Sequence, residues 1–267
     1  MPSLAIILGT AFSNDLPAGL SLQPETIPTP AGPWTLHRIV GLDHLAYLSF
    51  RHGVPHRLLP HQIPYRAQAH ALRAVDCGAL LVTSSVGVLD PSLPLYRPLA
   101  VSDLLMLDNR LPDGSTCTVF TEPSPEHGHL VLHDGLFSRE LTDQIAQLAE
   151  GEGAPVAGEA VFAYAGGPRT KTRAENRLLG KLGAQVNSMT FGPEVVLANE
   201  LEIPCAGLVV GHKYSVPDRE APSDPAAMAE TLVESRQGME RILLVFLRHG
   251  RPVPFGNQIY RFGKTAP

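Results

Sequence analysis

The sequence predicts an α/β fold, built as a single-domain three-layer sandwich with a mixed central sheet. Short apolar runs of strand length alternate with longer segments whose apolar residues recur at helical spacing, a pattern typical of βαβ units. Proline-rich, strand-like pieces between them predict additional hairpins. The 267 residues, 44% of them apolar, are enough for one large domain with a full core.

The composition argues against several classes of protein. The formal net charge is −5 and no basic run occurs, so nucleic acid is not an expected partner. No apolar run reaches the roughly 20 residues of a membrane span, and the first residues enter a strand without a basic leader segment. The three cysteines lack disulfide or metal spacing, which favours buried thiols in a reducing compartment. We therefore expect a cytoplasmic protein.

The chain is organised around one predicted βαβ unit over residues 46–87. Its first strand delivers Arg51 and His52 at the carboxyl end. A loop rich in proline and histidine follows, and a helix is expected from just after Pro64 to a stop at Cys77-Gly78. A buried parallel strand over residues 79–82 then leads into a predicted tight turn that carries two serines.

The other elements follow from periodicity and from start and stop signals. Ser138 is a candidate N-cap, Pro193 suits a first helical turn, and Ser223-Asp224-Pro225 is a strong helix start. Strands are expected over residues 4–8, 34–40 (as part of a hairpin), 100–101, 104–106, 117–120, 159–164, 185–190 and 205–210. Helices are expected over residues 137–150, 174–182, 193–201 and 225–248, the last with Met228, Leu232, Ile242 and Leu243 inward.

Two regions are predicted to be irregular. The tail, residues 250–267, is expected to lie on the surface or on a neighbouring subunit. His127, His129 and His133 cluster in a predicted surface loop, but no carboxylate or cysteine stands at ligand spacing. We therefore expect no metal site.

Hydroxyl groups recur where strands are predicted to end. Thr10 follows the strand 4–8, and Thr190 ends the strand 185–190; Ser84 and Ser85 follow the strand 79–82. The carboxyl ends of parallel strands meet at the ligand-binding edge of an open sheet. Together with the Arg51 cation and the His52 imidazole, these hydroxyls predict a site for an oxyanion such as phosphate.

Several motifs add a family resemblance. They are ILGTAF, FRHGVPHRLLPHQIPYRAQAHAL, LVTSSVGVL, AGGPRTKTRAE and GAQVNSMTFGPEVVLANELEIP, and they span most of residues 4–214. With them the chain resembles the trimeric purine nucleoside phosphorylase and methylthioadenosine phosphorylase family. The resemblance implies a nucleoside-phosphorylase-like fold, a homotrimer with active sites near subunit interfaces, and reversible phosphorolysis of a purine nucleoside. It implies no cofactor, with inorganic phosphate as co-substrate.

The resemblance also implies roles for individual residues. The phosphate ligands would be Thr10, Arg51, His52, Ser84, Ser85 and Thr190. Met189 would lie against the ribose, and the other substrate-binding residues would be Val86, Lys171, Lys213 and Ser215, with His52 and Lys213 as catalytic groups. A bound phosphate would stabilise an oxocarbenium-like C1′ and then attack it, and the guanidinium fork of Arg51 suits phosphate.

The departures from the family pattern lie in the base pocket. Lys171 stands where 6-oxopurine members carry a base-binding glutamate, and Lys213 stands where the family has asparagine or aspartate. Ser215 replaces a second aspartate of the methylthioadenosine enzymes. Serine alone cannot help to protonate adenine, so adenine specificity is doubtful, whereas Lys213 could donate to an oxopurine. Lysines that both point to solvent are the competing interpretation.

Three functions remain open on the sequence. The first is an active phosphorylase that weakly favours 6-oxopurine over adenine, on a ribose with or without a 5′-methylthio group. The second is a degenerate, non-enzymatic member that binds an aromatic ligand in the altered pocket. A hydrolase that uses water is a weaker third. For His212, beside Lys213, packing and ligand roles are equally open.

Overall fold

The structure is a computed structural model that describes residues 2–12, 17, 19–216, 219 and 224–262. Its strands are β1 (Ser3–Leu8), β2 (Ser21–Ile27), β3 (Trp34–Val40), β4 (Ala46–Phe50), β5 (Cys77–Val88), β6 (Pro98–Leu105), β7 (His129–Val131), β8 (Glu159–Tyr164), β9 (Val186–Ser188), β10 (Cys205–Tyr214) and β11 (Gln258–Tyr260). Its helices are α1 (Tyr65–Ala74), α2 (Arg139–Gly151), α3 (Arg173–Lys181), α4 (Gly192–Glu200) and α5 (Pro225–His249). Among the described helices, none is long and apolar enough to cross a membrane.

Nine strands form one mixed sheet in the order β10-β6-β8-β9-β5-β1-β4-β3-β2. β5 also pairs with β10, so β5, β10, β6, β8 and β9 close into a ring. The parallel pairs β1–β4, β1–β5 and β5–β10 bring the carboxyl ends of four strands to one edge. The predicted mixed sheet is confirmed, with half of it closed on itself.

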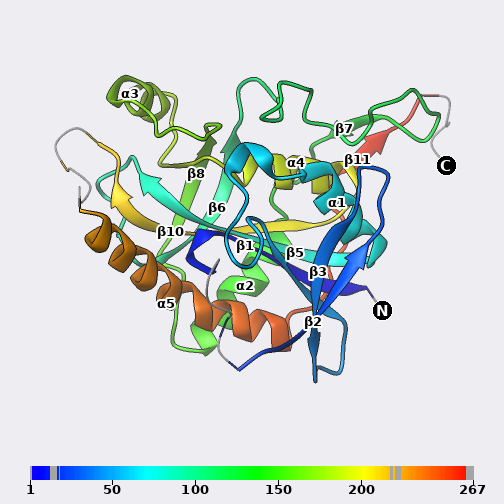
Figure 1. Cartoon of the computed structure of the whole chain (residues 1–267), viewed down its shortest axis with the longest axis horizontal. Coiled ribbons are helices and arrows are strands. Elements are labelled where there is room, and N and C mark those ends of the chain that lie inside the picture. The colour runs from blue at the N-terminus through cyan, green and yellow to red at the C-terminus, as the bar shows by residue number, and fades with distance from the viewer. Residues whose placement is uncertain (1, 13–16, 18, 217–218, 220–223, 263–267) are drawn as a thin grey trace.

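Helices cover both faces of this sheet, as Figure 1 shows, with α1 and α4 on one side and α2 and α5 on the other. Alternate residues of β1 divide between the two cores: Ala5 and Ile7 pack on the α1–α4 side, Leu4 and Ile6 on the α2–α5 side. The three-layer arrangement follows from strands that are apolar on both faces.

Local signals place most helix ends correctly. The Ser138 hydroxyl accepts a hydrogen bond from the Leu141 amide at 3.3 Å, the N-cap expected for α2. α5 begins at Pro225, as predicted, and Ile242 and Leu243 are buried. The orientations expected for Met228 and Leu232 lie outside the described side chains.

The central unit differs from the prediction at two points. α1 ends at Ala74, and Asp76 takes the left-handed conformation with φ of 52°, so Gly78 is not the helix stop but lies within β5. The expected turn after residue 82 is also wrong. The strand continues to Val88 because β10 pairs with it through Val88 and β9 pairs with its last two residues.

A predicted strand over residues 117–120 does not form. Instead the Glu200 carboxylate accepts hydrogen bonds from the Thr118 hydroxyl at 2.9 Å and the Val119 amide at 2.7 Å. These bonds hold the segment as a loop against the carboxyl end of α4, with Cys117 fully buried.

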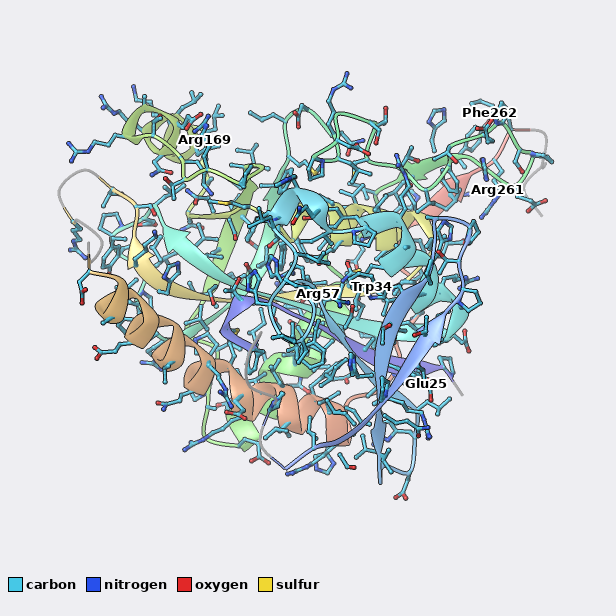
Figure 2. All side chains as sticks on the ribbon, in the orientation of Figure 1. Glu25, Trp34, Arg57, Arg169, Arg261 and Phe262 are labelled. Atoms are coloured by element: carbon cyan, nitrogen blue, oxygen red, sulfur yellow. The ribbon has the colours of Figure 1, made fainter. Side chains whose placement is uncertain are left out.

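The tail is less irregular than predicted, because β11 pairs with β7 of the same chain. Beyond β11, Arg261 donates to the Glu126 carbonyl at 2.8 Å, and the Phe262 ring meets His129 edge to face; Figure 2 shows both side chains beside this two-stranded sheet. Asn257 accepts hydrogen bonds from the amides of His133 and Asp134. The described part of the tail is therefore anchored to the loop that contains His129 and His133.

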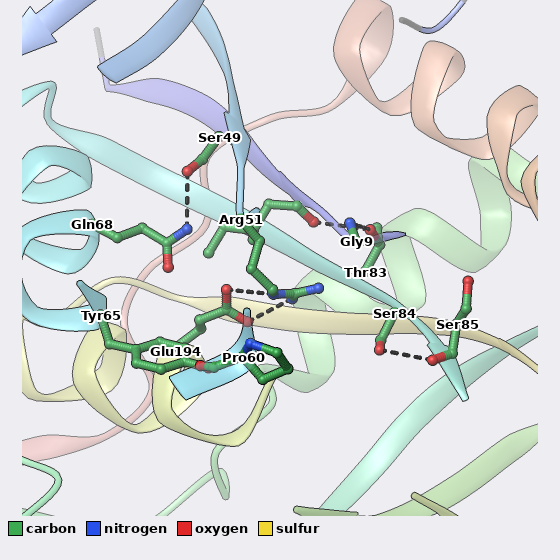
Figure 3. A network of polar contacts seen from close by, with 11 residues as sticks. Gly9, Ser49, Arg51, Pro60, Tyr65, Gln68, Thr83, Ser84, Ser85 and Glu194 are labelled. Carbon is green, nitrogen blue, oxygen red and sulfur yellow. Dashed lines mark hydrogen bonds and ion pairs between the residues drawn. The ribbon is translucent and has the colours of Figure 1, made fainter. Parts of the chain in front are cut away.

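A buried ion pair joins the end of β4 to the first turn of α4. The Arg51 Nε and Nη2 atoms donate to the two Glu194 carboxylate oxygens at 2.7 and 2.5 Å, and the side chains are 1% and 0% exposed. Figure 3 shows this pair with Gly9 and Thr83 close by. Such a bidentate pair fixes distance and orientation together.

Glu194→Gln is expected to lower the free energy of unfolding by about 3–5 kcal/mol, because it leaves the Arg51 guanidinium buried without a countercharge. Urea denaturation followed by circular dichroism measures this. The matched control is Glu25→Gln in the Glu25–Arg38 pair, whose side chains are 31% and 35% exposed; it should cost less than about 1 kcal/mol. Equal losses for the two variants would contradict a structural role for the buried pair.

Candidate active site

A cavity of about 600 Å³ opens at the sheet edge where β5, β9 and β10 end, large enough for a nucleoside-sized ligand. Eight of the predicted site residues line it: Thr10, His52, Ser85, Lys171, Met189, Thr190, Lys213 and Ser215. Segments far apart in sequence therefore meet at one place, as the sequence analysis expected. Their individual roles stay predictions.

Three predicted residues lie behind the cavity wall. Ser84 is 2% exposed and donates its hydroxyl to the Ser85 carbonyl at 3.2 Å, and Val86 is 0% exposed in the core. Alternation along β5 explains both, because residues on either side of Ser85 point to the opposite face. Arg51 also lies outside the cavity lining, because its guanidinium group, predicted to bind phosphate, donates to the Glu194 carboxylate instead.

The remaining nitrogen of Arg51, Nη1, packs against Gly9. A Cβ added at Gly9 would lie 3.0 Å from Nη1 and 3.2 Å from the Thr83 carbonyl oxygen, so only glycine lets the guanidinium approach β1 this closely. The Gly9 amide donates to the Thr83 hydroxyl at 3.3 Å. Arg51 thus supports the backbone that carries Thr10.

One end of the cavity gathers hydroxyl groups. Thr10 and Thr190 line it, and within the described residues the buried hydroxyl of Ser85 has no hydrogen-bond partner. Buried hydroxyls are normally paired, so an unpaired one that faces a cavity marks a place for a ligand acceptor or donor. This end is chemically suited to an oxyanion.

The turn after Thr190 is strained. Phe191 has φ of 82° and packs its buried ring on Phe162 with centroids 4.4 Å apart. At the next residue, Gly192, a Cβ would lie 2.8 Å from Tyr164 Cβ. A left-handed phenylalanine is rare and costs free energy, and here it sets the direction in which α4 leaves the cavity wall.

His52 is held as a neutral imidazole. Its Nδ1 lies 2.7 Å from the Leu58 carbonyl oxygen, and because a carbonyl only accepts, Nδ1 carries the proton and Nε2 is left as an acceptor. Burial, then the nearby Arg51 charge, lowers the pKa of His52 to about 4. The ring stacks on His56, with centroids 4.4 Å apart.

The opposite end of the cavity is basic. Lys171 lies two residues before α3 and Lys213 is the penultimate residue of β10, and both line the wall and are partly buried. That they face the base stays a prediction. Burial, followed by repulsion from Lys213, lowers the pKa of Lys171 to about 8. Burial lowers the pKa of Lys213 as well, and that of His212 falls to about 4.

Ser215 closes this end beside Gly87. A Cβ at Gly87 would collide with the Ser215 hydroxyl, so glycine is needed where β5 and the chain after β10 come together. The wall also contains residues that were not predicted from the sequence, among them His56 and Asn187. Both lie inside the quoted motifs, and Asn187 donates to Asn176 of α3 at 3.0 Å.

The histidine cluster of residues 127–133 stays separate from this cavity. His127 Nδ1 donates to the Glu122 carbonyl at 2.7 Å, and His129 lies in β7. Throughout the part of the chain that the structure describes, no three histidine, cysteine or acidic side chains are placed to hold a metal ion.

The two lowered histidine pKa values predict acid sensitivity. Between about pH 6.5 and about pH 4, His52 and His212 are protonated in the unfolded chain but neutral in the folded one. The unfolded state then binds more protons, so stability falls as pH falls through this window. Urea midpoints measured across it should decline, and His52→Gln, which keeps a donor for Leu58 but does not titrate, should flatten the decline. An unchanged slope in His52→Gln would show that His52 does not contribute.

Comparisons with known proteins agree with this geometry. Residues 8–248 match the model of the phosphorylase superfamily. A probable S-methyl-5′-thioinosine phosphorylase of Methanopyrus kandleri is 34% identical over 80% of each chain. A 6-oxopurine nucleoside phosphorylase of Pyrococcus furiosus is 31% identical, again over 80% of each chain, and an S-methyl-5′-thioadenosine phosphorylase of Thermofilum pendens is 30% identical over 83% of this chain and 82% of its own.

Solved structures show the same fold. A methylthioadenosine phosphorylase from Schistosoma mansoni, solved with adenine, superposes with a TM-score of 0.79 at 22% identity and covers 92% of this chain and 91% of its own. The fold, the cavity at the closed end of the sheet and the matched sequence all indicate the same family. The chain belongs to the phosphorylase superfamily, within its purine nucleoside and methylthioadenosine phosphorylase family.

Proposed function

We propose that this protein catalyses phosphorolysis of a purine nucleoside, releasing the free base and a ribose 1-phosphate. The observation that carries the proposal is the pairing of a hydroxyl-lined end and a basic end in one nucleoside-sized cavity. The names of the similar proteins, which are phosphorylases of methylthionucleosides and 6-oxopurine nucleosides, support the same reaction.

In this proposal phosphate binds between Thr10, Ser85 and Thr190, with the amino end of α4 close to Thr190. Hydroxyl donors and a helix amino terminus favour a dianion. Arg51 contributes more by positioning the backbone near the phosphate than by its charge, because Glu194 neutralises that charge. The bound phosphate lies where it stabilises the oxocarbenium-like C1′ and then attacks it.

The neutral Nε2 of His52 suits an acceptor role. A neutral imidazole accepts a hydrogen bond from a sugar hydroxyl or from the proton of hydrogen phosphate, whereas it cannot donate to phosphate through that nitrogen. Met189 lines the same cavity and is the group we assign to the ribose face.

We propose a 6-oxopurine in preference to adenine, on a ribose with or without a 5′-methylthio substituent. Lysine ammonium groups only donate, so Lys171 and Lys213 match an oxygen acceptor at position 6 better than an exocyclic amine. Ser215 adds a hydroxyl but no acid. The departure from the family's acidic residues also keeps a ligand-binding member without activity as the alternative.

The first prediction of this proposal is phosphate-dependent cleavage. Inosine, guanosine, adenosine, methylthioinosine and methylthioadenosine are incubated with the protein and followed by their ultraviolet spectra, with and without phosphate. Cleavage of at least one 6-oxopurine nucleoside, and only with phosphate present, is expected. Cleavage without phosphate would indicate a hydrolase, and silence across a wider nucleoside panel would favour the non-enzymatic alternative.

The second prediction concerns Ser85→Ala. Removing the hydroxyl should raise the KM for phosphate about tenfold, since one hydrogen bond to a charged ligand is lost, and should leave the KM for nucleoside nearly unchanged. The melting temperature should not fall, because the hydroxyl has no protein partner to lose among the described residues. Ser84→Ala is the matched control, since Ser84 bonds only to the adjacent carbonyl and should alter the phosphate KM little.

A further inference from the structure

Four basic side chains, Lys171, Arg173, Lys213 and Arg219, line the cavity, and its two lysines come from separate parts of the chain. Lys213 stands near the end of β10, paired in register with Gly87 of β5, and Lys171 stands in the loop between β8 and α3. Both side chains are partly buried, and each faces the same cavity. Because both line one cavity, a single ligand in it can contact both, and repulsion from Lys213 is one cause of the lowered pKa of Lys171.

Within the described part of the cavity wall, no carboxylate offsets this charge. Among the described residues that line it, none is aspartate or glutamate. The carboxylate that raises the pKa of Lys171, Glu175, is engaged elsewhere: Arg169 donates to it at 2.8 and 2.7 Å, and the Thr172 amide at 2.7 Å. In the part of the chain that the structure describes, neither Lys171 nor Lys213 has an ion-pair partner.

Partly buried charges without partners are costly unless a ligand supplies the countercharge. A neutral base would offer only hydrogen bonds and would leave the cations repelling each other. A base that carries negative charge would attract both and reduce their repulsion.

Resting on the proposed phosphorolysis, we propose that the base subsite is built for an anionic purine, a dioxopurine of the xanthine type, with Lys171 and Lys213 as its countercharges. A second carbonyl group on the ring acidifies the neighbouring ring N–H, so the xanthosine base loses a proton near neutral pH, whereas the bases of inosine and guanosine stay neutral. The two lysines are then specificity-determining residues for the charge of the base.

A lysine supplies the proton that the leaving base needs in this reaction. As the bond between C1′ and N9 breaks, its electron pair goes to the base, while a phosphate oxygen forms the new bond to C1′. An already anionic base would become a dianion, so an ammonium group of Lys171 or Lys213 transfers a proton to a base nitrogen. The amine regains a proton from water after the base leaves.

The test compares kcat/KM for xanthosine and inosine, with phosphate, between about pH 5 and about pH 8. Near neutral pH xanthosine should be favoured at least about tenfold, and its advantage should shrink in acid as its base becomes neutral. Lys171→Met and Lys213→Met should each lower kcat/KM for xanthosine at least about tenfold and that for inosine much less. Lys213→Arg should restore part of the xanthosine preference, and Lys181→Met, an exposed residue of α3 outside this cavity, should change neither substrate.

Inosine cleavage with no preference for xanthosine, or equal losses on both substrates in the lysine variants, would overturn the inference and leave phosphorolysis standing. If no nucleoside is cleaved, phosphorolysis fails, and calorimetric titration of the wild-type protein with free xanthine and free hypoxanthine decides the inference separately. Tighter binding of xanthine, lost in Lys213→Met, supports an anionic-base subsite. Equal binding, or binding of neither base, overturns it.

Discussion

The buried pair between Arg51 and Glu194 is the interaction on which the site depends. It ties the end of β4 to the start of α4, while the third guanidinium nitrogen packs on Gly9 after β1. His52, Thr190 and Thr10 are each one to four residues from a member of this cluster. Because a bidentate ion pair tolerates little change in distance or angle, three segments from distant parts of the sequence are held in one geometry.

The same pair decides where the net charge of the cavity lies. Glu194 cancels the charge of Arg51, so the hydroxyl end is polar but not strongly cationic. The positive charge of the cavity wall is on Lys171 and Lys213, together with Arg173 and Arg219. The cavity is therefore asymmetric: hydroxyls and a helix terminus at one end, and basic side chains at the other.

Local patterns in the sequence predicted the elements well, because caps and periodicity act over a few residues; Ser138 and Pro225 are examples. The elements that were predicted wrongly depend on contacts with residues distant in the sequence. The extension of β5 needs β9 and β10, and the loop at residues 117–120 needs Glu200. In the site, the motifs identified the right segments. They did not show that the carboxylate of Glu194, 143 residues away in the sequence, accepts hydrogen bonds from the Arg51 guanidinium. The burial of Ser84 and Val86 follows from strand alternation once Ser85 faces the cavity.

The number of charges at the basic end is itself constrained. His212 lies between β10 core residues and Lys213, and burial together with that lysine keeps its pKa near 4, so it adds no charge at neutral pH to those of the lysines and arginines in the wall. Lys171, with a pKa of about 8, is mostly protonated there yet gives up a proton more readily than an exposed lysine. A cation near the base and one readily donated proton are what departure of a singly charged base requires. A family member with acidic residues here would repel that base, so exchanging acid for lysine changes which charge state of the substrate the cavity can accept.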